Sequence, residues 1–129
     1  VSQYYYNNII KYNNLNANHR FPTTMVDSSD YKELFLLCNR SSPNTGTIAM
    51  YDIFLQNPKE LIIKGITMFS GGYNKHYREK IVTEEEVREL NKRVKNHNID
   101  FQKNFLSSFL KNKKIKPDAA LIESVYGKK

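Results

Sequence analysis

Apolar and polar residues follow one another along the chain in blocks that predict a mixed α/β fold. The continuous apolar run within residues 33–38 is typical of a short strand that is buried on both faces. Residues 47–56 are apolar almost all round, which predicts a buried helix, and Pro58 ends it because proline cannot continue the helical hydrogen bonds. Residues 61–66 predict a second strand. Strand, helix and strand together form one crossover unit, whose two strands we expect to be parallel.

The same unit predicts where a ligand binds. Residues 41–46 follow the first predicted strand, and residues 67–79 follow the second. Both loops leave the sheet at the carboxyl ends of its strands, the edge where open α/β sheets bind their ligands. We therefore expect the two loops to meet.

Helices are predicted in the rest of the chain. Thr83 followed by Glu86 has the sequence of a capping box, so a helix begins there. Residues 96–98 interrupt this helix, and a second apolar stripe at helical spacing starts at Phe101. Residues 117–127 end in glycine and predict a short last helix.

Length and composition indicate a single domain that spans residues 1–129. The chain is 129 residues long and 40% hydrophobic, which is enough for one packed core. No apolar run reaches the roughly 18 residues that a bilayer requires, so we expect no membrane span. The Asn- and Tyr-rich residues 3–18 are compatible with a short amphipathic helix.

The net charge of the chain indicates which kind of molecule it binds. The chain carries 20 Lys and Arg against 13 Asp and Glu, a net charge of +7 at pH 7. Five of those seven charges fall in residues 80–129, which hold twelve basic and seven acidic residues. An anion is therefore the expected partner, and phosphate, sugar nucleotide, nucleic acid and acidic lipid all remain open. Acidic residues interrupt the basic ones, so no basic stripe of the nucleic-acid-binding kind emerges.

Cysteine and histidine are too few for a structural metal site. Cys38 is the single cysteine, which excludes an internal disulfide and fits a buried strand thiol. His19, His76 and His97 are scattered along the chain, and we expect no metal ligation from them.

The two loops contain residues that suit an anion. Residues 43–46 precede the N-terminus of the predicted buried helix, where free N–H groups and the helix dipole attract negative charge. A plain strand-to-helix turn has the same composition. The second loop combines two glycines with the hydrogen-bond donors Tyr73, His76, Tyr77 and Arg78, which suits either a phosphate-binding lid or an exposed turn.

The position of His97 in the sequence allows two interpretations of its role. It falls on the apolar stripe that Val94 and Phe101 continue, where a histidine is usually a hydrogen-bonded core or rim residue. The alternative is a general base, because imidazole accepts a proton near neutral pH, and Asp100 would then orient the ring.

Four of these segments together resemble the C-terminal half of animal-type sialyltransferases and their viral and bacterial relatives. Residues 42–51 are similar to the small sialylmotif, and residues 61–65 to the strand ending in glycine that follows it. Residues 76–79 resemble the third motif, and residues 97–102 the last one. The segments occur in the family's order, and the resemblance covers about residues 33–115.

The resemblance implies a partial Rossmann-like α/β fold of the glycosyltransferase A variant type, with parallel strands and flanking helices. It also implies inverting transfer of sialic acid, or a related sugar acid, from a CMP-sugar to a glycan acceptor, with no metal or other cofactor. His97 would deprotonate the acceptor hydroxyl, and His76 and Tyr77 would contact the leaving phosphate, with Tyr73 a looser match. The remaining donor-binding positions would be Asn44, Thr45, Gly46 and Gly65.

The sequence departs from the family pattern at several points. Asn44 replaces a serine, and Gln102 replaces the acid of the last motif. The large sialylmotif is absent from these residues, so an N-terminal segment or a second chain is expected to complete the site. A non-catalytic structural or interaction protein of the same fold is therefore the alternative function. Localisation stays open between the Golgi lumen, a bacterial cytoplasm and a virus.

Overall fold

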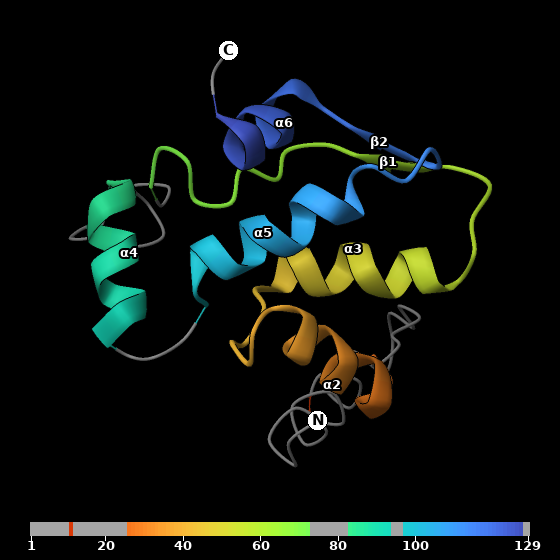
Figure 1. Ribbon diagram of the computed structural model, residues 1–129, viewed down its shortest axis with the longest axis horizontal. Helices are drawn as coiled ribbons and strands as arrows, with labels where there is room; N and C mark the ends of the chain where they lie inside the picture. The colour runs from red at the N-terminus through yellow and green to blue at the C-terminus, as the bar shows by residue number, and fades with distance from the viewer. Residues whose placement is uncertain (1–10, 12–25, 73–82, 94–96, 128–129) are drawn as a thin grey trace.

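The computed structural model of the protein describes residue 11 and residues 26–72, 83–93 and 97–127. Within these residues five helices accompany a two-stranded parallel sheet, so the expected mixed α/β fold is confirmed (Figure 1). The predicted helix at residues 3–18 lies outside the described residues apart from residue 11. In chain order the elements are α2 (Ser28–Leu37), α3 (Thr45–Leu55), β1 (Leu61–Ile63), α4 (Glu84–Arg93), α5 (Ile99–Phe109), β2 (Ile115–Pro117) and α6 (Ala119–Tyr126).

The predicted strand at residues 33–38 is wrong, because this apolar run is the second half of helix α2. The helix begins earlier, where the Asp27 carboxylate caps it by accepting a hydrogen bond from the Ser29 N–H at 2.8 Å. Leu34 and Cys38, one helical turn apart, are buried, whereas Leu37 is 49% exposed. Burial thus follows the helical period, which a short continuous apolar run does not reveal.

The sheet pairs different strands from those predicted. β1 runs parallel to β2, with Leu61 opposite Ile115 and Ile63 opposite Pro117. The strand predicted at residues 61–66 is therefore confirmed over its first half only. Its partner comes from a lysine-rich segment near the C-terminus, so the predicted crossover unit is wrong even though the pairing is parallel.

The predicted helix boundaries are largely confirmed. Thr83 and Glu86 form the reciprocal capping box, in which each N–H donates to the other side chain, at 2.9 and 3.2 Å. Helix α3 ends at Leu55, before Pro58. Helix α6 ends at Tyr126 and is capped by Gly127, whose φ of 85° lies in the left-handed region that glycine adopts without strain.

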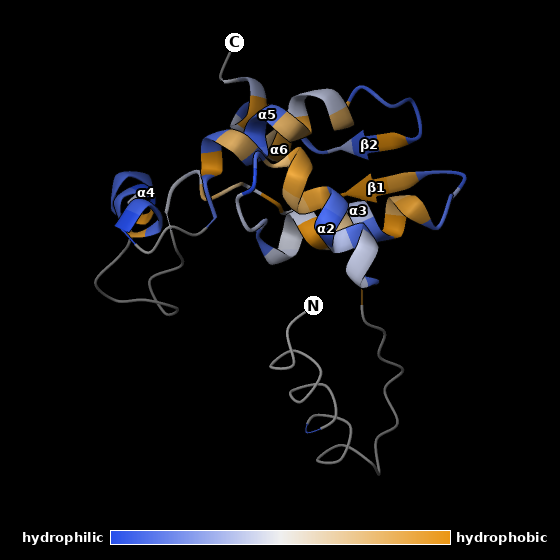
Figure 2. Cartoon of the chain, turned by 60° about the horizontal axis from the view of Figure 1, so that its bottom comes forward, coloured by the Kyte–Doolittle hydropathy of each residue, from blue (hydrophilic) through white to orange (hydrophobic). Residues whose placement is uncertain are grey.

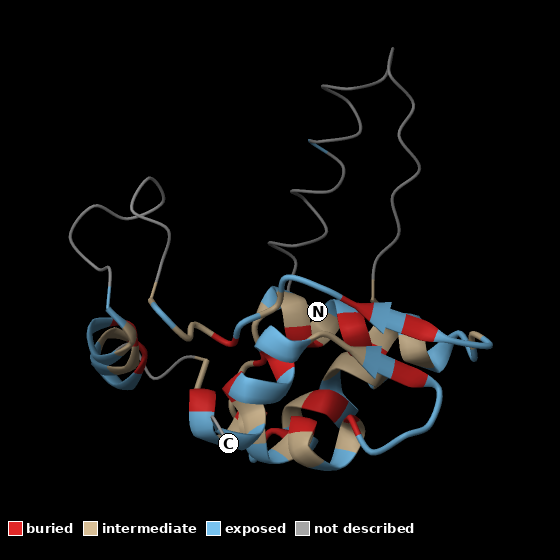
Figure 3. Ribbon diagram, turned by 90° about the horizontal axis from the view of Figure 1, so that it is seen from above, coloured by how far each residue is buried: buried red, intermediate tan, exposed pale blue. Residues whose placement is uncertain are grey.

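The core lies between α3, α5, α6 and the two strands. Phe105 and Phe109 of α5 stack with ring centroids 5.4 Å apart, and they also contact Tyr51 of α3. Hydrophobic residues concentrate on these elements, whereas α4 is mostly hydrophilic and lies to one side (Figure 2). Outer helix faces are exposed (Figure 3). The main buried cluster consists of Met50, Leu61, Ile63, Met68, Leu106, Leu110, Ile115 and Leu121.

Candidate functional site

The N-terminus of α3 is built by the loop that resembles the small sialylmotif. Asn44 is the N-cap, and its Oδ1 accepts a hydrogen bond from the Thr47 N–H at 2.8 Å. Thr45 and Gly46 form the first turn of the helix. Their N–H groups have no carbonyl acceptor within the helix, because the first turn of any α-helix lacks one. This end of α3 therefore presents main-chain donors.

Gln102 of α5 joins the two helices. Its side chain is fully buried, and Oε1 accepts hydrogen bonds from the Asn44 N–H at 2.9 Å and from the Thr47 hydroxyl at 3.0 Å. A buried donor that loses its acceptor costs about 1–3 kcal/mol. The neutral amide of Gln102 supplies both acceptor positions, so a carboxylate is not required at this place to hold α3 and α5 together.

His97 lies against the same loop. Its Nδ1 is 3.0 Å from the carbonyl oxygen of Ser42, and the N–H of the next residue, Asn98, donates to Ser41 Oγ at 2.8 Å. Because a carbonyl oxygen only accepts, Nδ1 is the donor, and the neutral ring then carries its lone pair on Nε2. His97 has a φ of 46°, and Asn98 caps α5, so the predicted interruption is confirmed at these two residues.

Two sequence segments far apart in the chain therefore meet in one group of hydrogen-bonded residues. We call this group the polar junction. It consists of Ser41, Ser42, Asn44, Thr47, His97, Asn98 and Gln102. The residues that resemble the small and the last sialylmotif thus lie side by side.

The beginning of the second loop also reaches α3. The sulfur of Met68, a buried residue, is 3.8 Å from Asn44 Nδ2 and 3.9 Å from Thr47 Oγ1. Gly65 turns the chain at a φ of 76°, and its N–H donates to the Asp118 carboxylate at 2.8 Å. This hydrogen bond, together with one from the Leu121 N–H, lowers the pKa of Asp118. The two loops therefore meet as expected, but not at the carboxyl edge of a sheet, because the first loop follows helix α2 and only the second follows a strand.

Part of the predicted site cannot be placed. Tyr73, His76 and Tyr77 lie outside the described residues, so their assignment to the leaving phosphate stays a prediction. Asp100, which was expected to orient His97, pairs instead with Arg88 of α4. The carbonyl of Ser42 in the first loop, and not the Asp100 carboxylate, therefore contacts the His97 ring and orients it.

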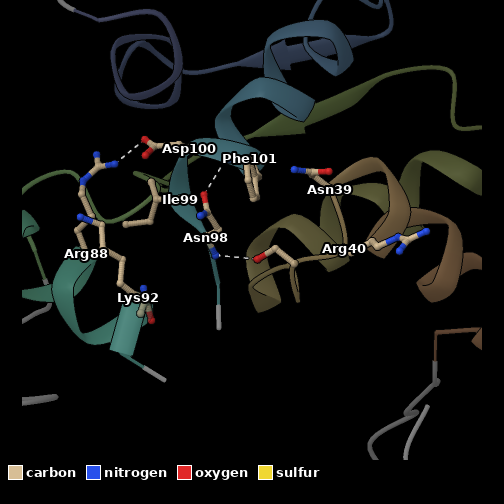
Figure 4. Close-up of a pocket in the computed structure, with 10 residues that line it drawn as sticks. Asn39, Arg40, Arg88, Lys92, Asn98, Ile99, Asp100 and Phe101 are labelled. Carbon is tan, nitrogen blue, oxygen red and sulfur yellow. Dashed lines mark hydrogen bonds and ion pairs between the residues drawn. The ribbon is translucent and has the colours of Figure 1, made fainter. Parts of the chain in front are cut away.

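A pocket of about 340 Å³ opens beside the polar junction. Arg88 and Lys92 of α4 lie on one side of it, opposite Asn98 and Asp100 at the start of α5 (Figure 4). No motif in the sequence indicates this pocket, because Arg88 following Glu84 by four residues predicts only an ion pair within a helix. The lining residues are Asn39, Arg40, Ser41, Arg88, Asn91, Lys92, Asn98, Ile99, Asp100 and Phe101.

Cys38 is not part of this chemistry. Its thiol is buried, as predicted, but at the C-cap of helix α2 and not in a strand. Burial raises the pKa of the Cys38 thiol to about 11, so the thiolate is not populated at neutral pH.

The described ranges show neither a metal cluster nor a membrane-spanning helix. No three His, Cys, Asp or Glu side chains in these ranges converge as ligands for a metal ion. None of the helices described is long and apolar enough to cross a membrane. No model of a known protein family, no curated protein and no solved structure matches this chain.

Proposed function

We propose that this chain carries part of a sialyltransferase-like site, which transfers sialic acid or a related sugar acid from a CMP-sugar to a glycan hydroxyl. The observation that carries the proposal is the 3.0 Å contact between His97 Nδ1 and the Ser42 carbonyl. It places the proposed base beside the loop to which the sequence resemblance assigns the nucleotide. A partial Rossmann-like fold of the glycosyltransferase A variant type belongs to the same proposal, and the parallel pairing of β1 and β2 supports it.

In the proposed reaction, the donor nucleotide binds at the start of α3. The Asn44 N–H already donates to Gln102, and the Thr47 N–H donates to Asn44. The N–H groups of Thr45 and Gly46 are therefore the ones that face a negatively charged ligand, and the positive end of the helix dipole adds to them. Gly65, where the chain turns after β1, contributes the other side of the donor site.

His97 performs the proton transfer. Its Nε2 accepts the proton of the acceptor hydroxyl, whose oxygen attacks the anomeric carbon of the donor sugar. As the new carbon–oxygen bond forms, the bond between that carbon and the phosphate oxygen breaks, and CMP leaves with the electron pair. Tyr73, His76 and Tyr77 stabilise the charge that develops on the phosphate. One displacement at the anomeric carbon inverts its configuration.

The test is release of CMP from CMP-sialic acid in the presence of a glycan acceptor. We expect the wild-type chain, supplied with the segment or second chain that completes the site, to release CMP. His97→Ala, supplied in the same way, should release it at least about 100-fold more slowly, because loss of a general base has this magnitude. His19→Ala is the matched control, since this histidine belongs to none of the motifs. Equal rates for the wild-type chain and His97→Ala in the completed site would contradict the proposal.

A non-catalytic interaction protein is the second candidate, and one observation favours it. Each of these hydrogen bonds of the polar junction involves a main-chain group or a fully buried side chain. Such bonds are also expected where the residues only hold α3 and α5 together. On this reading His97→Ala lowers the free energy of unfolding, and the wild-type chain neither binds nor turns over CMP-sugars. The same set of variants therefore separates the two functions.

A further inference from the structure

Basic residues outnumber acidic ones in the lining of the pocket between α4 and α5. Its lining contains three basic residues and one acidic residue, Asp100, whose carboxylate pairs with Arg88. Lys92 pairs with Glu89 at 2.9 Å, and both of these side chains are more than 60% exposed. Exposed pairs of this kind are weak, so Lys92 is available to a bound anion. Arg40 lies on the opposite rim, and its side chain extends away from α4 (Figure 4).

Asn91 adds a second and independent observation. It lines the pocket from α4, and the residue is 5% exposed. Among the residues that the structure describes, its Nδ2 is the single buried side-chain nitrogen or oxygen with no hydrogen-bond partner. An unsatisfied buried amide is rare because its desolvation is not compensated, and a bound water or ion is one way to satisfy it. A ligand that reached this nitrogen from the pocket would supply the missing acceptor.

The N-terminus of α5 lines the same pocket. Asn98 caps the helix by accepting from the Phe101 N–H at 3.0 Å, which leaves the N–H groups of Ile99 and Asp100 as first-turn donors. The helix is 11 residues long, so its dipole attracts an anion to this end. Basic residues, Asn91 and the N-terminus of α5 thus line one pocket.

The rest of the lining fits a sugar. Asn39, Ser41 and Asn98 offer side chains that bond hydroxyl groups, and Phe101 offers an apolar surface to a ring face. The volume of about 340 Å³ suits one monosaccharide, at the lower end of small-molecule sites. An inorganic anion such as phosphate would contact the basic residues, but it would leave these polar side chains and the Phe101 ring without a partner in the ligand.

We propose that this pocket binds a sugar acid, through its carboxylate, as the acidic unit of the acceptor glycan. The role as an acceptor subsite rests on the proposed function, whereas binding of the sugar acid does not. None of the donor-binding residues Asn44, Thr45, Gly46 and Gly65 lines the pocket. Ser41 and Asn98 do line it, and they are the chain neighbours of Ser42 and His97. An acceptor held here lies next to the base and apart from the nucleotide.

The test is an NMR titration of the full chain with sodium glucuronate, glucose and inorganic phosphate, each at constant ionic strength. We expect glucuronate to shift the amide signals of Asn98, Ile99 and Asp100 and the side-chain amide of Asn91 in a saturable way. Lys92→Gln should weaken glucuronate binding about fivefold, because it removes a charge-assisted hydrogen bond. Lys113→Gln is the matched control, since this exposed lysine lies in the α5–β2 connection.

Asn91→Leu is a second variant, which should weaken glucuronate binding about tenfold by removing the unpaired donor. Equal binding of glucose, binding of phosphate alone, or no shifts in this region would overturn the inference. A parallel titration with CMP separates it from the proposed function. If the chain binds glucuronate but not CMP, the transferase proposal is refuted and the sugar-acid site is retained. If it binds CMP but not glucuronate, only the sugar-acid site is refuted.

Discussion

The imidazole Nδ1 of His97 lies 3.0 Å from the carbonyl oxygen of Ser42, a residue 55 positions earlier in the chain. The two residues belong to segments that resemble different sialylmotifs, and the fold brings those segments together. The carbonyl also determines how the ring is oriented, because it accepts a hydrogen bond from Nδ1. The polar junction is thus both a connection between α3 and α5 and the setting of the proposed base.

Gln102→Leu should destabilise the protein by about 2–3 kcal/mol, because the Asn44 N–H and the Thr47 hydroxyl lose their buried acceptor. Urea unfolding followed by circular dichroism measures the change. Asn104→Leu is the matched control on the exposed face of the same helix, with an expected effect within about 0.5 kcal/mol. Equal stability of the two variants would show that Gln102 does not hold the junction.

The elements predicted correctly are those with local signals in the sequence. The capping box at Thr83 and the glycine at position 127 mark helix ends through short-range hydrogen bonds and backbone conformation. The apolar run at residues 33–38 has no such signal of its own. Its cap, Asp27, lies six residues upstream of residue 33, and burial in the tertiary fold decides that the run is helical.

His97→Ala should reduce transfer at least about 100-fold while changing the affinity for CMP by less than about threefold, since a base acts on the acceptor and not on the nucleotide. Initial rates of CMP release and calorimetric dissociation constants measure the two quantities. If His97→Ala loses CMP binding as well as activity, His97 maintains the structure of the site and does not perform the proton transfer.

Stability should fall at alkaline pH because of Cys38. Burial raises the pKa of its thiol from the usual value near 9 to about 11. A group whose pKa is raised by folding stabilises the fold in full below its unfolded pKa, and this contribution is lost as the pH rises through about 11. The pKa of Tyr51 in the same cluster is raised to about 12, first by burial, and extends the trend.

Urea unfolding at pH 8, 9.5 and 11 tests this dependence on pH. The midpoint should decrease over the series in the wild-type chain, and the decrease should be smaller in Cys38→Ala, which has no thiol to ionise. An equal decrease in both proteins would assign the effect to other groups.

Asn91→Leu should raise the stability of the unliganded protein by about 1 kcal/mol, because it removes a buried amide nitrogen without an acceptor. Thermal unfolding without and with glucuronate measures the effect. The ligand should stabilise the wild-type chain and have a smaller effect on the variant. A variant that is less stable than the wild type without ligand would show that the Asn91 amide is satisfied in solution.

Some residues that the sequence had singled out take part in the contacts of the polar junction. His97 and Asn44 belong to it and Gly46 lies beside it, and their roles in donor binding and proton transfer stay predictions. The pocket residues Arg88 and Asn91 carry no motif, because their roles depend on how α4 is placed against α5. Such placement is set by long-range contacts, and no pattern within one helix encodes it.

Calorimetric titration of the chain with CMP, without added metal, measures whether the start of α3 binds a nucleotide. We expect saturable binding by the wild-type chain and by His97→Ala with similar dissociation constants, because the nucleotide contacts the start of α3 and not the base. A folded wild-type chain that produces no heat of binding with CMP would contradict a donor site at the polar junction.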